Sequence, residues 1–174
     1  FSRSRGLGDV YKRQTRTQRE GERNGENYYF VDDPQFDQMI KDGEFLEHAD
    51  VFGKRYGSSR NEVDRCRAEG KDVILEIDWQ GADQVRRILP DAVSVFILPP
   101  SMAELESRLR GRGQDSQDAI STRLAEAETD IAQAKRYDYL VVNEDFKRAH
   151  TELLSIVQSA RLRQERQSKR AAVA

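Results

Sequence analysis

Three apolar runs of strand length, separated by segments long enough for helices, constrain the fold of this 174-residue chain more than any other feature. The runs are "DVILEID" (72–78), "AVSVFILPP" (92–100) and "YDYLVVN" (137–143). Near-continuous apolar strands are typical of a parallel sheet that helices cover on both faces. The alternation of such strands with helices therefore predicts an α/β fold with a parallel sheet.

Helical patterns fill the segments around these strands. Phe36 and Ile40 share one face of a helix for which Asp33 is the expected N-cap, Pro34 the first helical residue and Gly43 the stop. Further helices are predicted at about 59–69, 80–89, 102–111, 117–135 and 144–166.

Residues 27–58 have a different texture from the rest of the chain. The runs "NYYFV" (27–31), "EFLEHADVF" (44–52) and "KRYGSS" (54–59) mix aromatic, β-branched and polar residues. We therefore expect a small mixed or antiparallel lobe, inserted into the domain that holds the parallel sheet.

The charge balance and the cysteine content exclude several classes of protein. The chain has 29 Lys and Arg against 31 Asp and Glu, which argues against coating nucleic acid or an anionic membrane through bulk charge. Its one cysteine, Cys66, allows no intramolecular disulfide and no cysteine-based metal site. No apolar run approaches the length of a membrane span, and we expect a cytoplasmic protein. The sequence identifies no protein partner.

The two ends of the chain differ from its body. Residues 1–14, "FSRSRGLGDVYKRQ", show no sustained period and resemble translated sequencing-adapter read-through, so we expect a non-native or disordered leader. One domain is expected over residues 15–166, followed by a disordered tail at 167–174.

Two arginines and two tyrosines suggest a clamp for a phosphate group. Arg16 and Arg19 lie three residues apart in a polar stretch, and each guanidinium can bind two oxygens of a dianion. Tyr28 and Tyr56 can donate to the same phosphate without adding charge. The alternative is a solvated charged loop.

Glu47 and Ser58 suggest recognition of a purine base. A carboxylate accepts two parallel hydrogen bonds, and guanine offers such a pair from N1–H and its N2 amino group. Adenine has an unprotonated N1 there and would be repelled. Ser58 can donate to a base carbonyl. The alternative is that Glu47 points outward from a half-exposed strand.

Six motifs in consistent order and spacing now identify a family resemblance. They are "TRTQREGERNGENYYFV", "GEFLEHADVFGKRYGSS", "VILEIDWQGADQVR", "FILPPS", "RLRGRG" and "YLVVNEDF". Together they resemble the guanylate kinase family from Thr15 to about Arg166. The resemblance implies a P-loop nucleoside-monophosphate-kinase-like α/β fold, with a GMP-binding lobe at about 27–58 and a helical lid at about 108–125. It also implies transfer of the γ-phosphate of ATP, with Mg²⁺, to GMP in purine nucleotide metabolism.

The resemblance carries over to particular residues of this sequence. It implies GMP binding by Arg16, Arg19, Tyr28, Glu47, Tyr56, Ser58 and Glu76, catalysis by Asp78, Arg112 and Arg123, and ATP binding by Asn143. No residue is assigned as a direct metal ligand. Phosphoryl transfer needs positioning and charge neutralisation more than covalent chemistry, and arginines on a mobile lid supply both.

One family feature has no counterpart in the 174 residues. The family begins with a strand and a phosphate loop of the form G-x-x-G-x-G-K-[ST], and the chain contains no such pattern. A serine that the family uses for guanine falls in register with Lys12. We therefore expect the first strand and the phosphate loop to be missing and this chain to be inactive as given.

Two other functions remain open at this point. One is a guanylate-kinase-like module that binds a protein or phosphopeptide without catalysis, against which the lid residues Arg112 and Arg123 argue. The other is a kinase that acts on a sugar phosphate. The base-recognition set of Glu47, Ser58 and Glu76 argues against a sugar alone.

Overall fold

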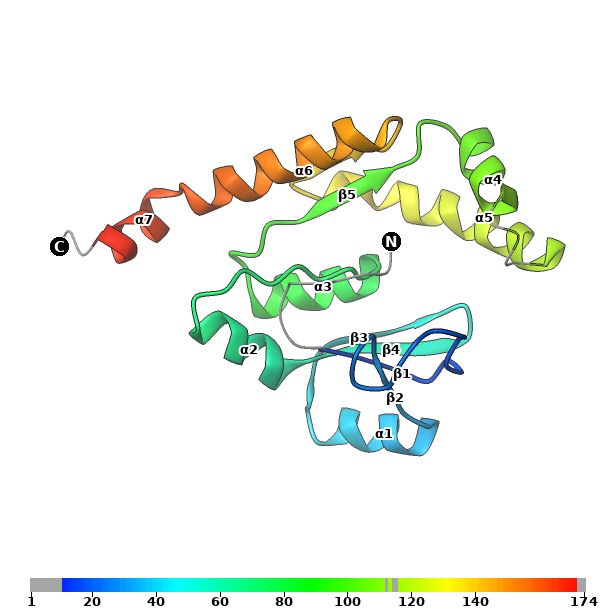
Figure 1. The fold of residues 1–174 in the computed structure, drawn as a ribbon, viewed down its shortest axis with the longest axis horizontal. Coiled ribbons are helices and arrows are strands. Elements are labelled where there is room, and N and C mark those ends of the chain that lie inside the picture. The colour runs from blue at the N-terminus through cyan, green and yellow to red at the C-terminus, as the bar shows by residue number, and fades with distance from the viewer. Residues whose placement is uncertain (1–10, 112, 114–115, 172–174) are drawn as a thin grey trace. The chain divides into compact units, whose positions relative to one another are not determined.

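The computed structural model describes residues 11–111, 113 and 116–171, and it divides into two compact units. The first unit is Phe1–Ala92 and the second is Val93–Ala174. Figure 1 shows the first in blue to green and the second in green to red.

The first unit is built on a four-stranded sheet in the order β2-β1-β4-β3. Its strands are β1 (Lys12–Gln14), β2 (Tyr29–Phe30), β3 (Phe45–Val51) and β4 (Lys54–Ser59). β1 runs parallel to β2 and antiparallel to β4, and β3 and β4 form an antiparallel hairpin. Phe52 and Gly53 join the hairpin with φ angles of 52° and 69°, as a two-residue turn with both residues left-handed requires. The predicted mixed lobe is therefore present and also includes β1.

Three helices accompany this sheet: α1 (Asp33–Lys41), α2 (Arg60–Ala68) and α3 (Trp79–Ile88). Asp32, and not the expected Asp33, caps α1. Its carboxylate accepts the Gln35 N–H at 2.8 Å, while the Gln35 side chain accepts the Asp32 N–H. This reciprocal pair fixes the start of α1 one residue earlier than the sequence predicted.

The core of the first unit lies on both faces of β3. Phe45 stacks on Phe36 of α1, with ring centroids 4.6 Å apart. Leu46 instead packs against Val63 of α2 and Val85 of α3, and all three are buried. In Figure 1, α1 and α3 accordingly lie on opposite sides of the sheet.

Segment 72–78 is not a strand, contrary to the prediction. Its exposure alternates from Val73 to Ile77, as in an extended chain, but no described strand forms a ladder with it. Strand geometry is stabilised by a neighbour's backbone groups, whereas here the side chains of Tyr11 and Lys12 donate to the carbonyls of Ile74 and Glu76.

Residues 11–14 belong to the first unit, although the sequence predicted them as part of a leader over residues 1–14. Arg13 pairs with Glu62 at 2.8 Å and lies over the ring of Tyr29. Gln14 is fully buried in β1, yet neither polar atom of its side-chain amide has a partner. This stretch therefore makes ordinary sheet contacts together with one poorly satisfied buried group. Residues 1–10 lie outside the described residues.

The second unit contains a parallel pair of strands and most of the helical residues. Its elements are β5 (Val95–Leu98), β6 (Tyr139–Val142), α4 (Met102–Gly111), α5 (Gln117–Ala132), the 3₁₀ turn η1 (Ala134–Arg136), α6 (Phe146–Arg161) and α7 (Gln164–Ala171). The expected helix at 144–166 is thus two helices. Gln167 donates to the carbonyl of Arg161 at 2.8 Å, which satisfies the end of α6. Residues 167–171 of the expected disordered tail are helical, and 172–174 lie outside the described residues.

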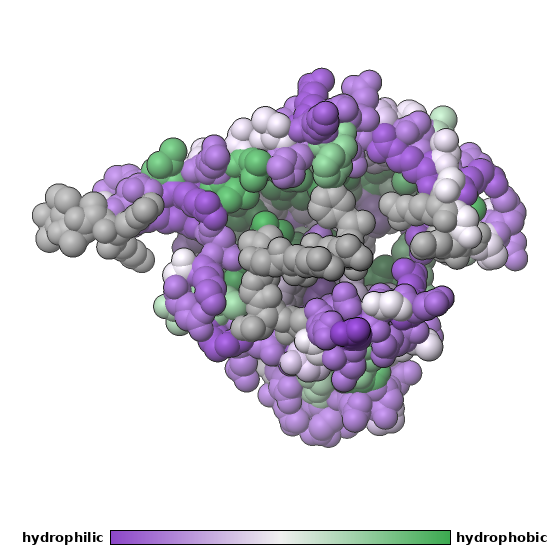
Figure 2. All heavy atoms as spheres, viewed as in Figure 1, coloured by the Kyte–Doolittle hydropathy of each residue, from purple (hydrophilic) through white to green (hydrophobic). Residues whose placement is uncertain are grey.

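The strands of the second unit are less buried than the sequence predicted. Val141 is 2% exposed, but Ile97 and Leu140 are 51% and 53% exposed. Figure 2 shows apolar surface in green over β5 and α6. A sheet of two described strands has fewer neighbours to cover its side chains than the predicted three-stranded one. Over the described residues, no helix combines the length and the apolar composition needed to cross a membrane.

Candidate functional site

Glu47 and Ser58 form a buried pair on the β3–β4 hairpin. Ser58 Oγ donates to Glu47 Oε1 at 2.5 Å, and the two residues are 0% and 4% exposed respectively. Glu47 is therefore an interior carboxylate and does not point outward, while its role toward a base stays a prediction. We call Glu47, Ser58, Glu76 and Asp78 the carboxylate end of the site.

A β-bulge aims Glu47 inward. Phe45 lies opposite Ser59 and Glu47 lies opposite Ser58, so Leu46 is the extra residue on β3. A bulge of this kind re-aims the side chains that follow it. Because of the bulge, two consecutive side chains, Leu46 and Glu47, both lie toward α3.

Asp78 supports the carboxylate end from the start of α3. It is the N-cap of that helix, and its Oδ1 accepts the Gly81 N–H at 2.9 Å. Burial raises the pKa of Glu47, and the charge of Asp78 adds to the rise, while Ser58 and Lys12 oppose it. Glu76 is exposed at this end of the site, on the segment before α3.

Lys12 lies inside the carboxylate end, a placement that sequence reasoning missed. It is directly opposite Ser58 in the β1–β4 ladder, and its Nζ lies 3.9 Å from Glu76 Oε2. Burial lowers the pKa of Lys12, against the attraction of Glu76 and Glu47. The only available signal was the register that places Lys12 where the family resemblance expects a serine.

The second half of the site, which we call the arginine end, consists of Arg16, Arg19, Tyr28 and Tyr56. Arg16 Nη2 donates to both oxygens of Glu22, at 2.8 and 3.1 Å, and the Arg19 main-chain N–H donates to Glu22 at 2.7 Å. Burial alone would raise the pKa of Glu22, but these bonds outweigh it and lower that pKa. Glu22 therefore stays ionised and occupies the guanidinium of Arg16, a role that the sequence did not indicate.

The two tyrosines lie close enough to the arginine end to interact with it. Burial raises the pKa of Tyr28, with Glu76 adding to the rise and Arg16 opposing it. Tyr56 interacts with both Tyr28 and Arg16. The structure thus brings Arg16, Tyr28 and Tyr56 close enough to affect one another, and the charge of Glu76 also acts on Tyr28.

The remaining predicted residues belong to the second unit. Arg123 lies in α5 and is half-buried. Asn143 follows β6, where its N–H donates to Leu98 at 2.8 Å and its carbonyl accepts from Arg108 at 2.7 Å. Arg112 lies outside the described residues. The roles of these three residues stay predictions.

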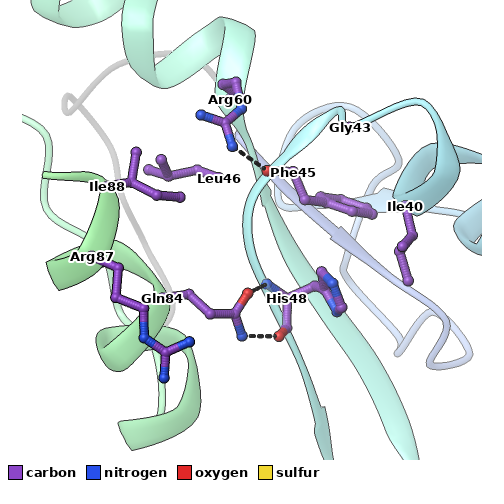
Figure 3. A pocket seen from close by; sticks show the side chains of 9 residues that line it. All are labelled: Ile40, Gly43, Phe45, Leu46, His48, Arg60, Gln84, Arg87 and Ile88. Carbon is purple, nitrogen blue, oxygen red and sulfur yellow. Dashed lines mark hydrogen bonds between the residues drawn. The ribbon is translucent and has the colours of Figure 1, made fainter.

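A separate cleft of about 250 Å³ lies beside β3 (Figure 3). It is lined by Ile40, Gly43, Phe45, Leu46, His48, Arg60, Gln84, Arg87 and Ile88. None of the residues of the carboxylate end or the arginine end lines it, so this cleft is not the predicted nucleotide site.

No group of three or more His, Cys, Asp or Glu side chains able to hold a metal ion occurs among the described residues. Carboxylates beside a serine hydroxyl, together with guanidinium and phenol groups, suit a ligand with a base at one end and a phosphate at the other. Within an α/β fold, that combination is typical of a nucleoside-monophosphate kinase.

Comparisons with known proteins identify the family. A family profile described as guanylate kinase matches residues 9–160. Guanylate kinases of Escherichia coli K12 and Photorhabdus laumondii are each 51% identical over 156 residues, covering 90% of this chain and 75% of theirs. The crystal structure of guanylate kinase from Anaplasma phagocytophilum matches with a TM-score of 0.78 at 35% identity, covering 90% of this chain and 77% of that one. The chain belongs to the guanylate kinase family and has its nucleoside-monophosphate-kinase-like fold.

Proposed function

We propose that this chain binds GMP as the acceptor of a phosphoryl group from ATP, giving GDP and ADP. The observation that carries this proposal is the buried Glu47–Ser58 pair on the β3–β4 hairpin. The buried free thiol of Cys66 agrees with a reducing cytoplasm as the place of this reaction.

Glu47 reads the base. Its ionised carboxylate accepts from guanine N1–H and the N2 amino group, whereas adenine leaves both the base and the carboxylate unsatisfied. Ser58 donates to Glu47 in this structure and so holds the carboxylate in place. To donate to the guanine carbonyl, the Ser58 hydroxyl has to turn away from Glu47. Glu76, whose Oε2 lies 3.9 Å from Lys12 Nζ, offers a second carboxylate.

The arginine end holds the phosphate of GMP. Arg16 and Arg19 neutralise the dianion, and the phenols of Tyr28 and Tyr56 donate to its remaining oxygens. Glu22 competes for Arg16, because it already accepts two bonds from that guanidinium. GMP binding therefore exchanges an internal carboxylate for a phosphate at Arg16.

The family resemblance implies Mg²⁺ together with ATP, and the carboxylate end fits it. The two oxygens of Asp78 accept from Gly81 and Gln80, and each keeps a lone pair for a metal or its bound water. Magnesium takes one or two carboxylates together with phosphates, and it neutralises charge on the transferring group. Arg112 and Arg123 would neutralise charge on the transferring phosphoryl group, and Asn143 would bind the adenine of ATP.

Calorimetric titration with GMP and AMP tests the acceptor site without requiring turnover. We expect GMP to bind at least about tenfold more tightly than AMP, because one charge-assisted pair is replaced by a repulsive one. Equal affinity for the two nucleotides would remove Glu47 from base recognition. Binding of neither nucleotide, together with capture of a phosphopeptide, would favour a non-catalytic module.

An assay of ADP release tests the transfer step. The 174 residues contain no G-x-x-G-x-G-K-[ST] pattern, so we expect no turnover of ATP and GMP by this polypeptide. A fusion to an N-terminal strand and phosphate loop of this form should gain turnover. Activity of the unfused polypeptide would mean that another segment holds the triphosphate, and an inactive fusion that binds both nucleotides would contradict the proposed transfer.

A further inference from the structure

Two contacts from α3 reach the part of β3 that carries Glu47, and neither comes from a residue that the sequence singled out. The first is made by Gln84. Its side-chain oxygen accepts the His48 N–H at 3.1 Å, and its side-chain nitrogen donates to the His48 carbonyl at 2.7 Å (Figure 3). One amide therefore satisfies both main-chain groups of the residue that follows Glu47.

The position of β3 in the sheet explains why this pair matters. Among the described strands, β3 lies at the edge of its sheet, and an edge strand presents N–H and carbonyl groups that no neighbouring strand pairs. The Gln84 amide takes the place of a neighbouring strand for a single residue, His48. It thereby fixes the backbone of β3 directly beside the β-bulge at Leu46.

The second contact involves Gly81, three residues before Gln84 and on the same face of α3. A Cβ atom at residue 81 would overlap Glu47 Oε2 and would lie 3.2 Å from Glu47 Cδ. Glycine is the residue that leaves this space to the carboxylate. Gly81 also lies in the first turn of α3, where the helix dipole favours a negative charge.

We infer that Gly81 and Gln84 are positioning residues, through which α3 sets the place of the Glu47 carboxylate and hence the preference for guanine. This inference rests on the proposed base-reading role of Glu47. Neither residue contacts the base itself. Gln84 fixes the backbone, Gly81 leaves room for the carboxylate, and Ser58 holds its other oxygen. A carboxylate that recognises a base has to be fixed in position before the ligand binds. A mobile carboxylate could also rotate and accept hydrogen bonds from the wrong base.

The Gln84 contact is tested with Gln84→Met, which keeps the length of the side chain and removes both hydrogen bonds. Calorimetry with GMP and IMP gives a ratio of dissociation constants that reports the N2 amino group alone. We expect that preference for GMP to fall at least threefold, while the affinity for IMP changes less than twofold. Gln38→Met is the matched control, because Gln38 pairs only with Asp42 on the exposed face of α1.

The Gly81 contact is tested with a double-mutant cycle between residues 81 and 47. In the parent chain, Gly81→Ala should lower the GMP-over-IMP preference at least fivefold and lower the melting temperature. In a Glu47→Ala background the added methyl no longer meets the carboxylate. There, Gly81→Ala should leave the nucleotide ratio unchanged and raise the melting temperature, because alanine favours a helix.

The outcomes separate this inference from the proposed function. An unchanged GMP-over-IMP ratio in both Gln84→Met and Gly81→Ala, with lowered melting temperatures, would make the two residues merely structural and overturn the inference. Equal GMP and IMP binding by the parent chain would instead overturn the base-reading role of Glu47. In that case, the melting temperatures of the cycle still decide whether α3 holds the carboxylate, since equal effects of Gly81→Ala in the two backgrounds would refute that placement.

Discussion

The carboxylate end and the arginine end of the site are built in opposite ways. Glu47 and Ser58 are 4% and 0% exposed, and they are held by a bulged hairpin and by the first turns of α3. Arg19 is exposed, and Arg16 is engaged by Glu22, a residue of its own loop. In the proposed function, the base would meet a carboxylate that is already in place, and the phosphate would meet an arginine that has to leave Glu22.

This difference assigns specificity and affinity to different parts of the first unit. A buried hydrogen-bonding group penalises a wrong partner strongly, because the group that stays unpaired cannot turn to water. An exposed arginine is screened and solvated, so it attracts any phosphate and penalises none. Selectivity among nucleotides should accordingly depend on Glu47, and the overall affinity for nucleotides should depend on Arg16 and Arg19.

The largest expected effect comes from Glu47→Gln, which attacks the carboxylate end alone. The amide keeps one acceptor but turns a donor toward the donors of guanine. Hydrogen bonds to charged groups contribute about 1.5–3 kcal/mol, so we expect at least about a tenfold weaker binding of GMP. Binding of IMP, which lacks the N2 amino group, should weaken less, and calorimetry with both nucleotides measures the difference.

The comparison with IMP decides whether Glu47 reads the base. A Gln variant that keeps the full preference for GMP over IMP would show that Glu47 only fills space between β3 and α3. In the fused chain that carries a phosphate loop, the same loss should appear in kcat/KM for GMP.

Arg19→Ala is the corresponding change at the arginine end and should have a smaller and uniform effect. An exposed charge contributes up to about 1 kcal/mol, so we expect GMP, IMP and AMP each to bind about fivefold more weakly. The ratios between the three should stay constant, because a phosphate carries no base identity. A change in those ratios would contradict the separation of the two ends.

The carboxylate end shows how far the sequence predicted the site. Glu47 and Ser58 lie in short motifs whose chemistry can be read directly, and the structure places them together as expected. Lys12, Gly81 and Gln84 were missed, because their importance depends on which strand is at the edge of the sheet and on where a bulge falls. Neither fact follows from a pattern of apolar residues.

The fold shows the same limit. A strand at 44–52, a small mixed or antiparallel lobe and the position of α2 were predicted from β-branched, aromatic and glycine residues close in sequence. Segment 72–78 was predicted as a strand from its composition, but a strand also needs a neighbour, and no described strand pairs with it. By contrast, β5 and β6 were predicted from the same kind of apolar run, and they pair with each other although they lie far apart in sequence. An apolar run thus becomes a strand where a partner strand is present, which its own composition does not show.

Glu22→Gln tests the arginine end by removing the carboxylate that pairs with Arg16, without removing an arginine. Glu22 pairs with Arg16 and stays ionised because the hydrogen bonds from Arg16 and Arg19 lower its pKa. Removing its charge frees Arg16 and removes repulsion of the phosphate, so we expect GMP and AMP both to bind about threefold more tightly. Glu26→Gln is the control, because Glu26 pairs with Arg23 on the exposed side of the same loop. A change in the GMP-to-AMP ratio would tie Glu22 to the base instead.

The smallest expected effect is on the free energy of unfolding, which should depend on the ionisation of Glu47. Burial raises the pKa of Glu47 above the unfolded value of 4.5, so the folded state binds a proton more readily than the unfolded state. Stability contributed at this residue is therefore highest below pH 4.5 and falls as the pH rises through the folded pKa. Relative to Glu47→Gln, the parent chain should lose free energy of unfolding between acid and neutral pH. Lys12 and Asp78 face the same carboxylate but are present in both chains, so the difference isolates residue 47. Urea unfolding of both chains from pH 4 to pH 8 measures it, and a constant difference would mean that Glu47 ionises as freely in the folded site as in water.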